Sequence, residues 1–339
     1  MNPIPLGMSG TPKEAFYWET LKDSSVKCLL CPHYCLIHEN SSGACGVRYN
    51  LGGRLFSANY GRACLAIDPV EKKPLYHWKP GSMILSLGTA GCNMFCPFCQ
   101  NAHLSRSSDL SHLASITKDQ VLNFARGENI SSVAFTYNEP TVWFEFVLET
   151  SELLKRSGIS VVLVTNGFIS EEPLDQLLPL TDAMNIDLKS FSEISYRKMG
   201  GAMEPVLKNI ERTYRQGVHL EITHLVVPGI NDSMEEFEKM SAWISSISPK
   251  IPLHISRYFP AFEWQMPPTP QEDIEQRMTA ASKNLRYVYS GNLPGTNNTK
   301  CPNCGETVIE RDRYYKVSTR LDHEGACSRC KTPQGIVMR

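Results

Sequence analysis

The chain has 339 residues and a formal net charge of −1, with 42% hydrophobic and 20% charged residues. This near-neutral balance excludes a global field that would draw the chain to nucleic acid or to a membrane, and the apolar content is ordinary for a protein with a large core. No window of about 18 apolar residues predicts a membrane-spanning helix, and the first residues lack the basic and apolar regions of a signal peptide. We therefore expect a cytoplasmic protein with no membrane partner.

Twelve cysteines are the most informative part of the composition. Without a secretion signal, they are not expected to form disulfides. Eleven of them fall into three groups, which are Cys28, Cys31, Cys35 and Cys45, then Cys92, Cys96 and Cys99, then Cys301, Cys304, Cys327 and Cys330. This grouping predicts three metal sites, and we interpret the remaining Cys64 as a small buried apolar side chain.

The first group follows a leader, residues 1–27, in which we find no chemistry. Its spacing is C-x2-C-x3-C-x9-C, and four thiolates can close around zinc or hold an iron–sulfur cube. The sequence leaves the choice between zinc and iron open. His33 and His38 lie between these cysteines and could replace one of them, but we interpret both as solvated loop residues.

A connecting segment, residues 50–81, shows neither helical nor strand periodicity and carries several turn formers. Its charged residues could face an active site, but we predict that they belong to a solvated loop. These residues are Asp68, Glu71, Lys72, Lys73 and His77.

From residue 82 onward, short apolar runs alternate with helical patterns. The runs lie near residues 82–88, 132–137, 160–165, 183–188, 219–227 and 252–259. Continuous apolar runs are typical of parallel strands that are buried on both faces. Between them, Thr117 and Gln120 form a capping box that predicts the start of a helix. Six strands with helical crossovers favour an α/β fold, a right-handed βα barrel or partial barrel with its functional site at the carboxyl ends of the strands.

The three-cysteine group, at spacing C-x3-C-x2-C, directly follows the first of these strands. Thiolates prefer soft metal centres, and three are one fewer than the four that usually hold an iron–sulfur cube. A cube held in this way would leave one iron open to a substrate or cofactor. A structural zinc loop with a distant fourth ligand is the alternative.

The last group consists of two C-x2-C pairs separated by 22 residues. This pattern is typical of a zinc ribbon or rubredoxin-like site, for which we expect zinc, with a single iron as the alternative. From residue 300 to the end there are eight Lys and Arg against five Asp and Glu, a net charge of +3. This basic tail could touch RNA or form a solvated surface.

The loop with Cys92, Cys96 and Cys99 resembles the cluster loop of the radical S-adenosylmethionine (SAM) enzymes. The resemblance covers nearly the whole chain and is nearest to the AmmeMemoRadiSam-system radical SAM enzymes, which are related to pyruvate formate-lyase activating enzyme. It rests on the cysteine module at 28–35, the segment 68–77, the loop 88–93, the turn 137–141 and the terminal ribbon. It implies a (βα)6 partial TIM barrel, a 4Fe–4S cluster on the three cysteines, and SAM on the fourth iron.

The resemblance also implies SAM contacts at successive strand ends. Asn138 and Glu139 stand in the family's Gly-Gly-Glu-Pro motif and would hold the SAM ammonium, although Tyr-Asn replaces the two glycines here. A helix start with an acid near the helix dipole is the alternative interpretation of Glu139. The further implied contacts are Phe98, Thr165, Asn166, Asp187, Lys189 and His254, and a core histidine is the alternative for the last of these.

The activity that the resemblance implies is reductive cleavage of SAM to methionine and a 5′-deoxyadenosyl radical, which abstracts hydrogen from an unidentified substrate. A flavodoxin or ferredoxin would supply the electron, and the substrate could be a small molecule, a protein or RNA. Activation of a glycyl-radical enzyme is one option, although the extra cysteines precede the cluster loop instead of following it. A zinc-rich RNA- or protein-binding adaptor without turnover is the alternative from another class.

We predict three domains: a cysteine-rich module with its connecting segment over residues 1–81, a radical SAM core over 82–295, and a zinc-ribbon-like module over 296–339.

Overall fold

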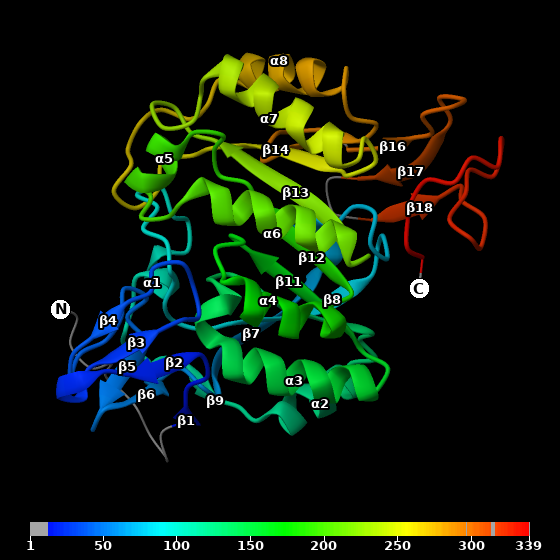
Figure 1. Cartoon of the computed structure of the whole chain (residues 1–339). Helices are drawn as coiled ribbons and strands as arrows, with labels where there is room; N and C mark the ends of the chain where they lie inside the picture. The colour runs from blue at the N-terminus through cyan, green and yellow to red at the C-terminus, as the bar shows by residue number, and fades with distance from the viewer. Residues whose placement is uncertain (1–12, 296, 313–315, 339) are drawn as a thin grey trace.

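A nine-stranded sheet forms the centre of the protein in the computed structural model, which describes residues 13–295, 297–312 and 316–338 (Figure 1). The strand order is β15-β14-β13-β12-β11-β10-β8-β7-β9. The parallel strands are β8 (Met83–Gly88), β10 (Ser132–Phe135), β11 (Ser160–Thr165), β12 (Ala183–Asp187), β13 (His219–Val226), β14 (Leu253–Arg257) and β15 (Val288–Gly291). The α/β class is therefore confirmed, and each of the six predicted runs contains a strand.

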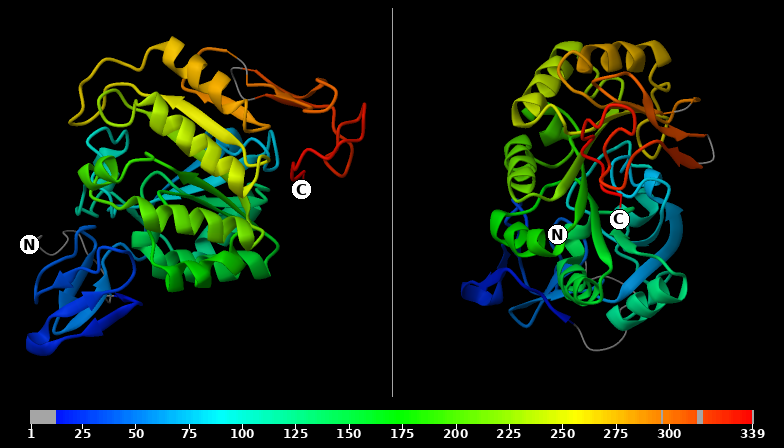
Figure 2. Two further views of the ribbon diagram at one scale, coloured as in Figure 1. Left: turned by 45° about the horizontal axis from the view of Figure 1, so that its top comes forward. Right: turned by 90° about the vertical axis from the view of Figure 1, so that its right-hand side faces the viewer.

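Helices follow the strands and form an outer layer around the curved sheet (Figure 2, right). They are α1 (Ala102–Ser105), α2 (Lys118–Gly127), α3 (Phe144–Arg156), α4 (Glu171–Leu177), α5 (Glu193–Lys198), α6 (Met203–Arg215), α7 (Met234–Ile247) and α8 (Gln271–Ala281). The predicted capping box is confirmed at α2: Gln120 N donates to Thr117 Oγ1 at 3.2 Å, and Thr117 N donates to Gln120 Oε1 at 2.8 Å. No helix of the described residues is long and apolar enough to cross a membrane.

The segment between β7 (Arg62–Pro69) and β8 fills the interior of the curved sheet. Val70, Leu75 and Trp78 form one buried cluster with side chains of four parallel strands. The predicted solvated loop is wrong here, because Glu71, Lys73 and His77 are 3%, 3% and 1% exposed.

Partners from distant parts of the chain satisfy the polar atoms of this interior segment. The backbone N–H groups of Tyr76 and His77 donate to the Glu221 carboxylate at 3.0 and 2.7 Å, and His77 Nε2 lies 2.7 Å from the Tyr289 hydroxyl. Buried backbone groups must be paired, and the Glu221 side chain pairs these two N–H groups.

Two small modules flank the large sheet at its opposite ends (Figures 1 and 2). The N-terminal one contains the antiparallel sheets β1-β6-β5 and β2-β3-β4, with β1 (Lys13–Glu14), β2 (Trp18–Thr20), β3 (Val26–Cys28), β4 (Leu36–Ile37), β5 (Arg48–Leu51) and β6 (Arg54–Ser57). The C-terminal one contains β16 (Thr299–Lys300), β17 (Thr307–Arg311) and β18 (Val317–Thr319). Between the modules, β7 and β9 (Ala114–Ser115) extend the large sheet in the antiparallel sense.

Candidate active site

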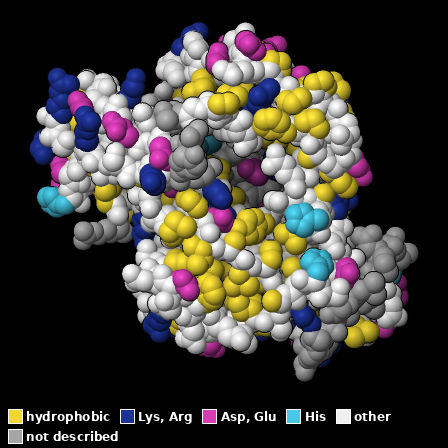
Figure 3. All heavy atoms as spheres, turned by 180° about the vertical axis from the view of Figure 1, so that it is seen from behind, with side chains coloured by type: hydrophobic (Ala, Val, Ile, Leu, Met, Phe, Trp, Pro, Cys, Tyr) yellow, Lys and Arg dark blue, Asp and Glu magenta, His cyan; other side chains and the backbone are white. Residues whose placement is uncertain are grey.

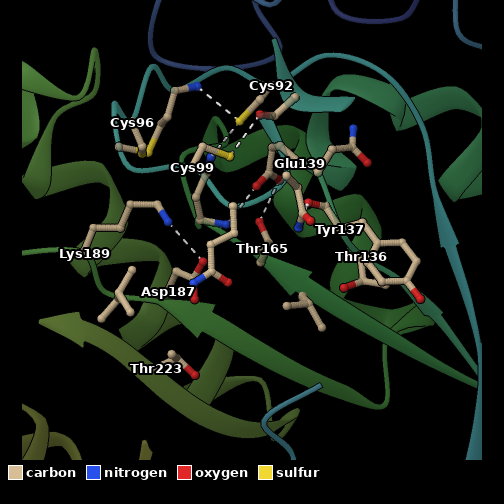
Figure 4. Close-up of a pocket in the computed structure, with 18 of the residues that line it drawn as sticks. Cys92, Cys96, Cys99, Thr136, Tyr137, Glu139, Thr165, Asp187, Lys189 and Thr223 are labelled. Atoms are coloured by element: carbon tan, nitrogen blue, oxygen red, sulfur yellow. Dashed lines mark hydrogen bonds and ion pairs between the residues drawn. The ribbon is translucent and has the colours of Figure 1, made fainter. Parts of the chain in front are cut away.

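A cavity of about 380 Å³ lies at the carboxyl ends of the parallel strands. Residues at or next to the carboxyl ends of several parallel strands line it, among them Leu225 and Ser256. Figure 4 shows Thr136, Thr165 and Asp187 in this lining. Sites on parallel α/β sheets form at this end of the strands, as the sequence predicted. On the opposite face from Figure 1, the surface is hollowed near its centre, with charged side chains of both signs around the hollow (Figure 3).

Cys92, Cys96 and Cys99 all line this cavity, and the predicted contact Phe98 lines it between them. The loop leaves β8 through Gly91, whose φ of +92° is in the region that favours glycine. Burial raises the pKa of the Cys96 thiol to about 11. Cys96 is buried and Cys92 and Cys99 are half-buried. Three thiols that line one cavity suit a soft metal centre, which would favour their ionised form.

Glu139 connects the ends of two strands and is 1% exposed. Its Oε1 accepts hydrogen bonds from Thr141 N at 2.9 Å and from the hydroxyls of Thr141 and Thr165, both at 2.7 Å. Its Oε2 accepts one bond, from Asn166 N at 2.8 Å, and so keeps acceptor capacity. Burial raises the pKa of the carboxyl, while these hydrogen bonds oppose the rise.

Both interpretations of Glu139 find support in this geometry. The residue caps the short 3-10 helix Pro140–Trp143, as the alternative interpretation expected. It also lines the cavity, where the resemblance placed it. A buried carboxylate with a free acceptor position fits a cationic ligand group such as an ammonium.

Two asparagines of the predicted set line the cavity and also fix the cysteine loop. Asn138 Oδ1 accepts a hydrogen bond from Thr89 N at 3.0 Å, and its Nδ2 donates to a loop carbonyl at 2.8 Å. Asn166 Nδ2 donates to Asn93 Oδ1 at 2.9 Å and lies 3.8 Å from Cys92 Sγ. Their amides therefore position the thiols.

Asp187 and Lys189, which end β12 and follow it, form an ion pair with 3.0 Å between Oδ2 and Nζ. Both line the cavity, where the resemblance placed them, and Figure 4 shows the pair on the same side as Cys96. Burial opposes the charge of Lys189, but Asp187 and the Cys96 thiolate outweigh burial and raise the pKa of Lys189. The site thus holds an ion pair close to the cysteine loop.

His254 is the predicted SAM contact that the structure places outside the cavity lining, which begins two residues further along its strand. Its ring is 3% exposed, and Nε2 lies 2.7 Å from Glu221 Oε2. Burial raises the pKa of Glu221, but hydrogen bonds from His219 and His254 outweigh burial and hold the pKa well below its usual value. His254 is a core histidine, which the sequence analysis gave as the alternative.

Tyr137 is a cavity residue to which the sequence analysis assigned no role. Its φ of 70° is in the left-handed region, which bulky residues rarely adopt. Its hydroxyl donates to Asp68 Oδ2 at 2.6 Å, and Lys73 Nζ lies 2.7 Å from the same oxygen. Burial raises the pKa of Asp68, but the bonds from Lys73, Tyr137 and Ser86 outweigh burial and hold it at about 2. In the sequence, the replacement of the motif's Gly-Gly by Tyr137 and Asn138 was the feature that could have pointed to this residue.

The thiols of Cys28, Cys31, Cys35 and Cys45 line one small cavity in the N-terminal module. His33 lines it as well, and its Nε2 lies 2.7 Å from the backbone oxygen of Asn93 in the cluster loop. The interpretation of His33 as a solvated loop residue is therefore wrong, whereas His38 is exposed as expected.

The C-terminal cysteines form the tightest sulfur group. The sulfurs of Cys301, Cys304, Cys327 and Cys330 all lie within 4.8 Å of one another, and among the described residues this is the only such group of three or more potential ligands. Cys64 belongs to none of the groups, and its sulfur lies 3.5 Å from Gly88 O. The residue is half-buried, so the prediction of a buried side chain is wrong.

Comparison with known proteins gives three findings. Residues 86–243 match the model of the radical SAM superfamily. The chain is 38% identical over 326 residues to the uncharacterized protein MJ0808 of Methanocaldococcus jannaschii, over 94% of this chain and 97% of that protein. It is 25% identical over 232 residues to the pyruvate formate-lyase-activating enzyme of Staphylococcus epidermidis, over 62% of this chain and 90% of that enzyme.

Among solved structures, the radical SAM methyltransferase from Sphaerobacter thermophilus matches with a TM-score of 0.50 at 14% identity. The match covers 64% of this chain and 68% of that one, and it is a similarity of fold.

Proposed function

Because this chain belongs to the radical SAM superfamily and is related to the pyruvate formate-lyase activating enzymes, we propose that it is an enzyme that cleaves SAM reductively. When bound, the cluster and SAM supply the chemistry: one electron breaks a carbon–sulfur bond to give methionine and a 5′-deoxyadenosyl radical that abstracts hydrogen from the substrate. The core in this proposal is a (βα)6 partial TIM barrel, which the six strand–helix units from β8 support.

The chain's own residues hold and orient these groups. Cys92, Cys96 and Cys99 bind the cluster, and their number leaves the fourth iron for SAM. Glu139 accepts a hydrogen bond from the SAM ammonium at Oε2, close to the ends of β10 and β11. Lys189 provides a positive charge for the carboxylate of the bound ligand. A cavity of about 380 Å³ is within the size range of sites for small ligands.

One observation carries the proposal: three thiols and a buried carboxylate with spare acceptor capacity converge on one cavity at the strand ends. A structural zinc site needs four ligands close together, and among the described residues Cys92, Cys96 and Cys99 belong to no compact group of potential ligands.

The C-terminal site, in our proposal, binds zinc and has a structural role. A tetrahedral zinc site with bonds of about 2.3 Å places its sulfurs about 3.8 Å apart. The Cys301–Cys330 and Cys304–Cys327 sulfur pairs lie 3.5 and 3.7 Å apart, so the group has nearly this size.

A direct test uses protein that is reconstituted with iron and sulfide in the absence of oxygen and then mixed with SAM and dithionite. We expect 5′-deoxyadenosine from the native chain and from Cys64→Ala, and none from the variant in which Cys92, Cys96 and Cys99 are alanine. If the native chain makes none, the proposal is wrong and the adaptor without turnover remains.

A second candidate is the activation of a glycyl-radical enzyme, which the relatives favour. Besides the staphylococcal enzyme, the putative glycyl-radical enzyme activating enzyme MJ1227 of M. jannaschii is 27% identical over 159 residues, 44% of this chain and 64% of that protein. Incubation with SAM, reductant and pyruvate formate-lyase would give the EPR doublet of a glycyl radical if this candidate is correct. A flavodoxin or ferredoxin would be the electron donor in either case.

A further inference from the structure

The four thiols of the N-terminal module are arranged differently from those at the C-terminal site. They surround one cavity, yet no three of their sulfurs all lie within 4.8 Å of one another. A single zinc ion would draw four sulfurs to about 3.8 Å spacing, as the C-terminal group nearly shows. A cube of iron and sulfide is larger than one ion, so its ligands must stand further apart.

The surroundings of this cavity suit a large anionic cluster. Arg48 lines it, is 2% exposed, and is held in place by Glu145 at 2.8 Å. The backbone N–H of Ala44 lies 3.5 Å from Cys35 Sγ. A protein tunes the reduction potential of an iron–sulfur cluster through nearby charges and through N–H groups that donate hydrogen bonds to sulfur.

The module also touches the cluster loop of the active site directly. His33 lies between Cys31 and Cys35, and its Nε2 donates to Asn93 O, the residue next to Cys92, at 2.7 Å. On the other side, a Cβ built on Gly91 would lie 2.8 Å from Cys45 O. Two segments of the N-terminal module therefore pack against the two residues that flank Cys92.

This contact lies away from the space for SAM and substrate. None of residues 28–45 lines the active-site cavity, whereas Cys92, Cys96 and Cys99 all do. A path for electrons through the N-terminal module therefore stays open when ligands fill the cavity.

We propose that Cys28, Cys31, Cys35 and Cys45 hold a second iron–sulfur cluster that passes electrons to the cluster on the loop; the role as a relay rests on the proposed function. A one-electron donor of the flavodoxin or ferredoxin class loses one electron to the N-terminal cluster. This cluster is reoxidised when it reduces the loop cluster by the same electron. No bond forms or breaks in the transfer, and the hydrogen bond between His33 and Asn93 joins the two cluster-binding segments directly.

Metal analysis tests the identity of the site. After anaerobic reconstitution we expect about eight irons per native chain, four for each cluster, with zinc at the C-terminal site. The variant with Cys92, Cys96 and Cys99 as alanine should keep about four irons and a cluster EPR signal on reduction. Zinc in place of iron in that variant would overturn the proposal.

Reduction kinetics test the relay. In Cys28→Ala/Cys31→Ala, reduction of the loop cluster by reduced flavodoxin should slow by roughly tenfold or more, while dithionite still reduces that cluster and added SAM still changes its EPR signal. His33→Ala keeps all four thiols and should also slow the reaction with flavodoxin, and Cys64→Ala is the control. Unchanged rates in both variants would disprove the relay, and the EPR response shows whether each variant has kept its active-site fold.

The outcomes separate this inference from the proposed function. Formation of 5′-deoxyadenosine by a chain with zinc at Cys28 to Cys45 refutes the relay alone. A chain with two clusters that forms no 5′-deoxyadenosine with dithionite refutes the activity and leaves the second cluster in place.

Discussion

Glu139 serves two purposes with one buried side chain. Its hydrogen bonds connect the ends of β10 and β11, and Oε2 keeps an open acceptor position on a side chain that lines the cavity. Glu139→Gln keeps the shape and removes the charge. A hydrogen bond to a charged group contributes about 1.5–3 kcal/mol, so we expect SAM binding to weaken about tenfold or more.

Titration of SAM against the cluster EPR signal measures this effect. Glu152→Gln is the matched control, because Glu152 is exposed on α3. Equal affinities in the two variants would show that Glu139 has only its capping role.

Asp68 makes a residue-scale prediction about pH. Its pKa of about 2 in the fold is lower than the value of about 3.9 in an unfolded chain, so the ionised carboxylate stabilises the fold above about pH 4. This contribution is lost as the pH falls toward 2. Between about pH 5 and pH 3, the free energy of unfolding should therefore fall more for the native chain than for Asp68→Asn.

Urea unfolding at each pH measures the difference, with the exposed Asp119→Asn as a control that should behave like the native chain. A parallel fall in all three proteins would contradict the prediction.

At the scale of the elements, the end of β8 and the end of β10 approach each other without room for a side chain. A Cβ on Gly88 would lie 2.8 Å from Tyr137 Cδ2 and 3.0 Å from Thr136 O, and the latter is backbone that cannot rotate away. Gly88→Ala should therefore push the cysteine loop from its place and lower the stability by about 1–3 kcal/mol. Iron content after reconstitution and the unfolding midpoint both measure the change.

Gly127→Ala is the control for this variant. A Cβ at Gly127, the last residue of α2, meets nothing within 4 Å, so alanine should be neutral or stabilise by up to about 1 kcal/mol. A stable, iron-replete Gly88→Ala would show that the two strand ends can separate.

The elements differ in how well the sequence predicted them. The parallel strands are continuous apolar runs because helices and interior side chains cover both faces, and such runs are visible without a structure. β7 was missed because Ala66 and Ile67 on it are exposed, so the strand lacks that pattern. The interior segment after β7 was missed because partners such as Glu221 and Tyr289, far away in the sequence, compensate the burial of its polar groups.

The site residues likewise differ in how well the sequence predicted them. Cysteine spacing marks metal ligands because coordination needs those side chains at those intervals, and strand ends mark cavity residues such as Asp187. The place of His254 depended on how deep the cavity reaches, which a single strand cannot reveal. The contact of His33 with the cluster loop depended on how the N-terminal module packs.

At the scale of the whole molecule, Arg311 joins the C-terminal module to the interior of the large sheet. The side chain is 3% exposed; it donates to Tyr76 O at 2.6 Å and lies 3.8 Å from Glu71. Arg311→Ala leaves a buried carboxylate with less compensation, which should cost about 3–5 kcal/mol. Thermal and urea unfolding measure the loss.

Arg320→Ala is the matched control on the same module. Arg320 has a side chain 58% exposed and pairs with Glu306, and an exposed pair contributes about 0–1 kcal/mol. A similar loss for both variants would mean that the module and the sheet are stabilised independently.

The left-handed backbone of Tyr137 has a consequence for how related chains are found. A search that demands two small residues before the Glu-Pro step would pass over this protein, although the backbone there takes a turn that glycine normally supplies. The phenol offsets that conformational penalty by anchoring to a carboxylate across the sheet. Distant members of the family should therefore be recognised by an aromatic residue at this turn together with an acidic residue at the position of Asp68. Members that lack either residue should have glycine at the turn.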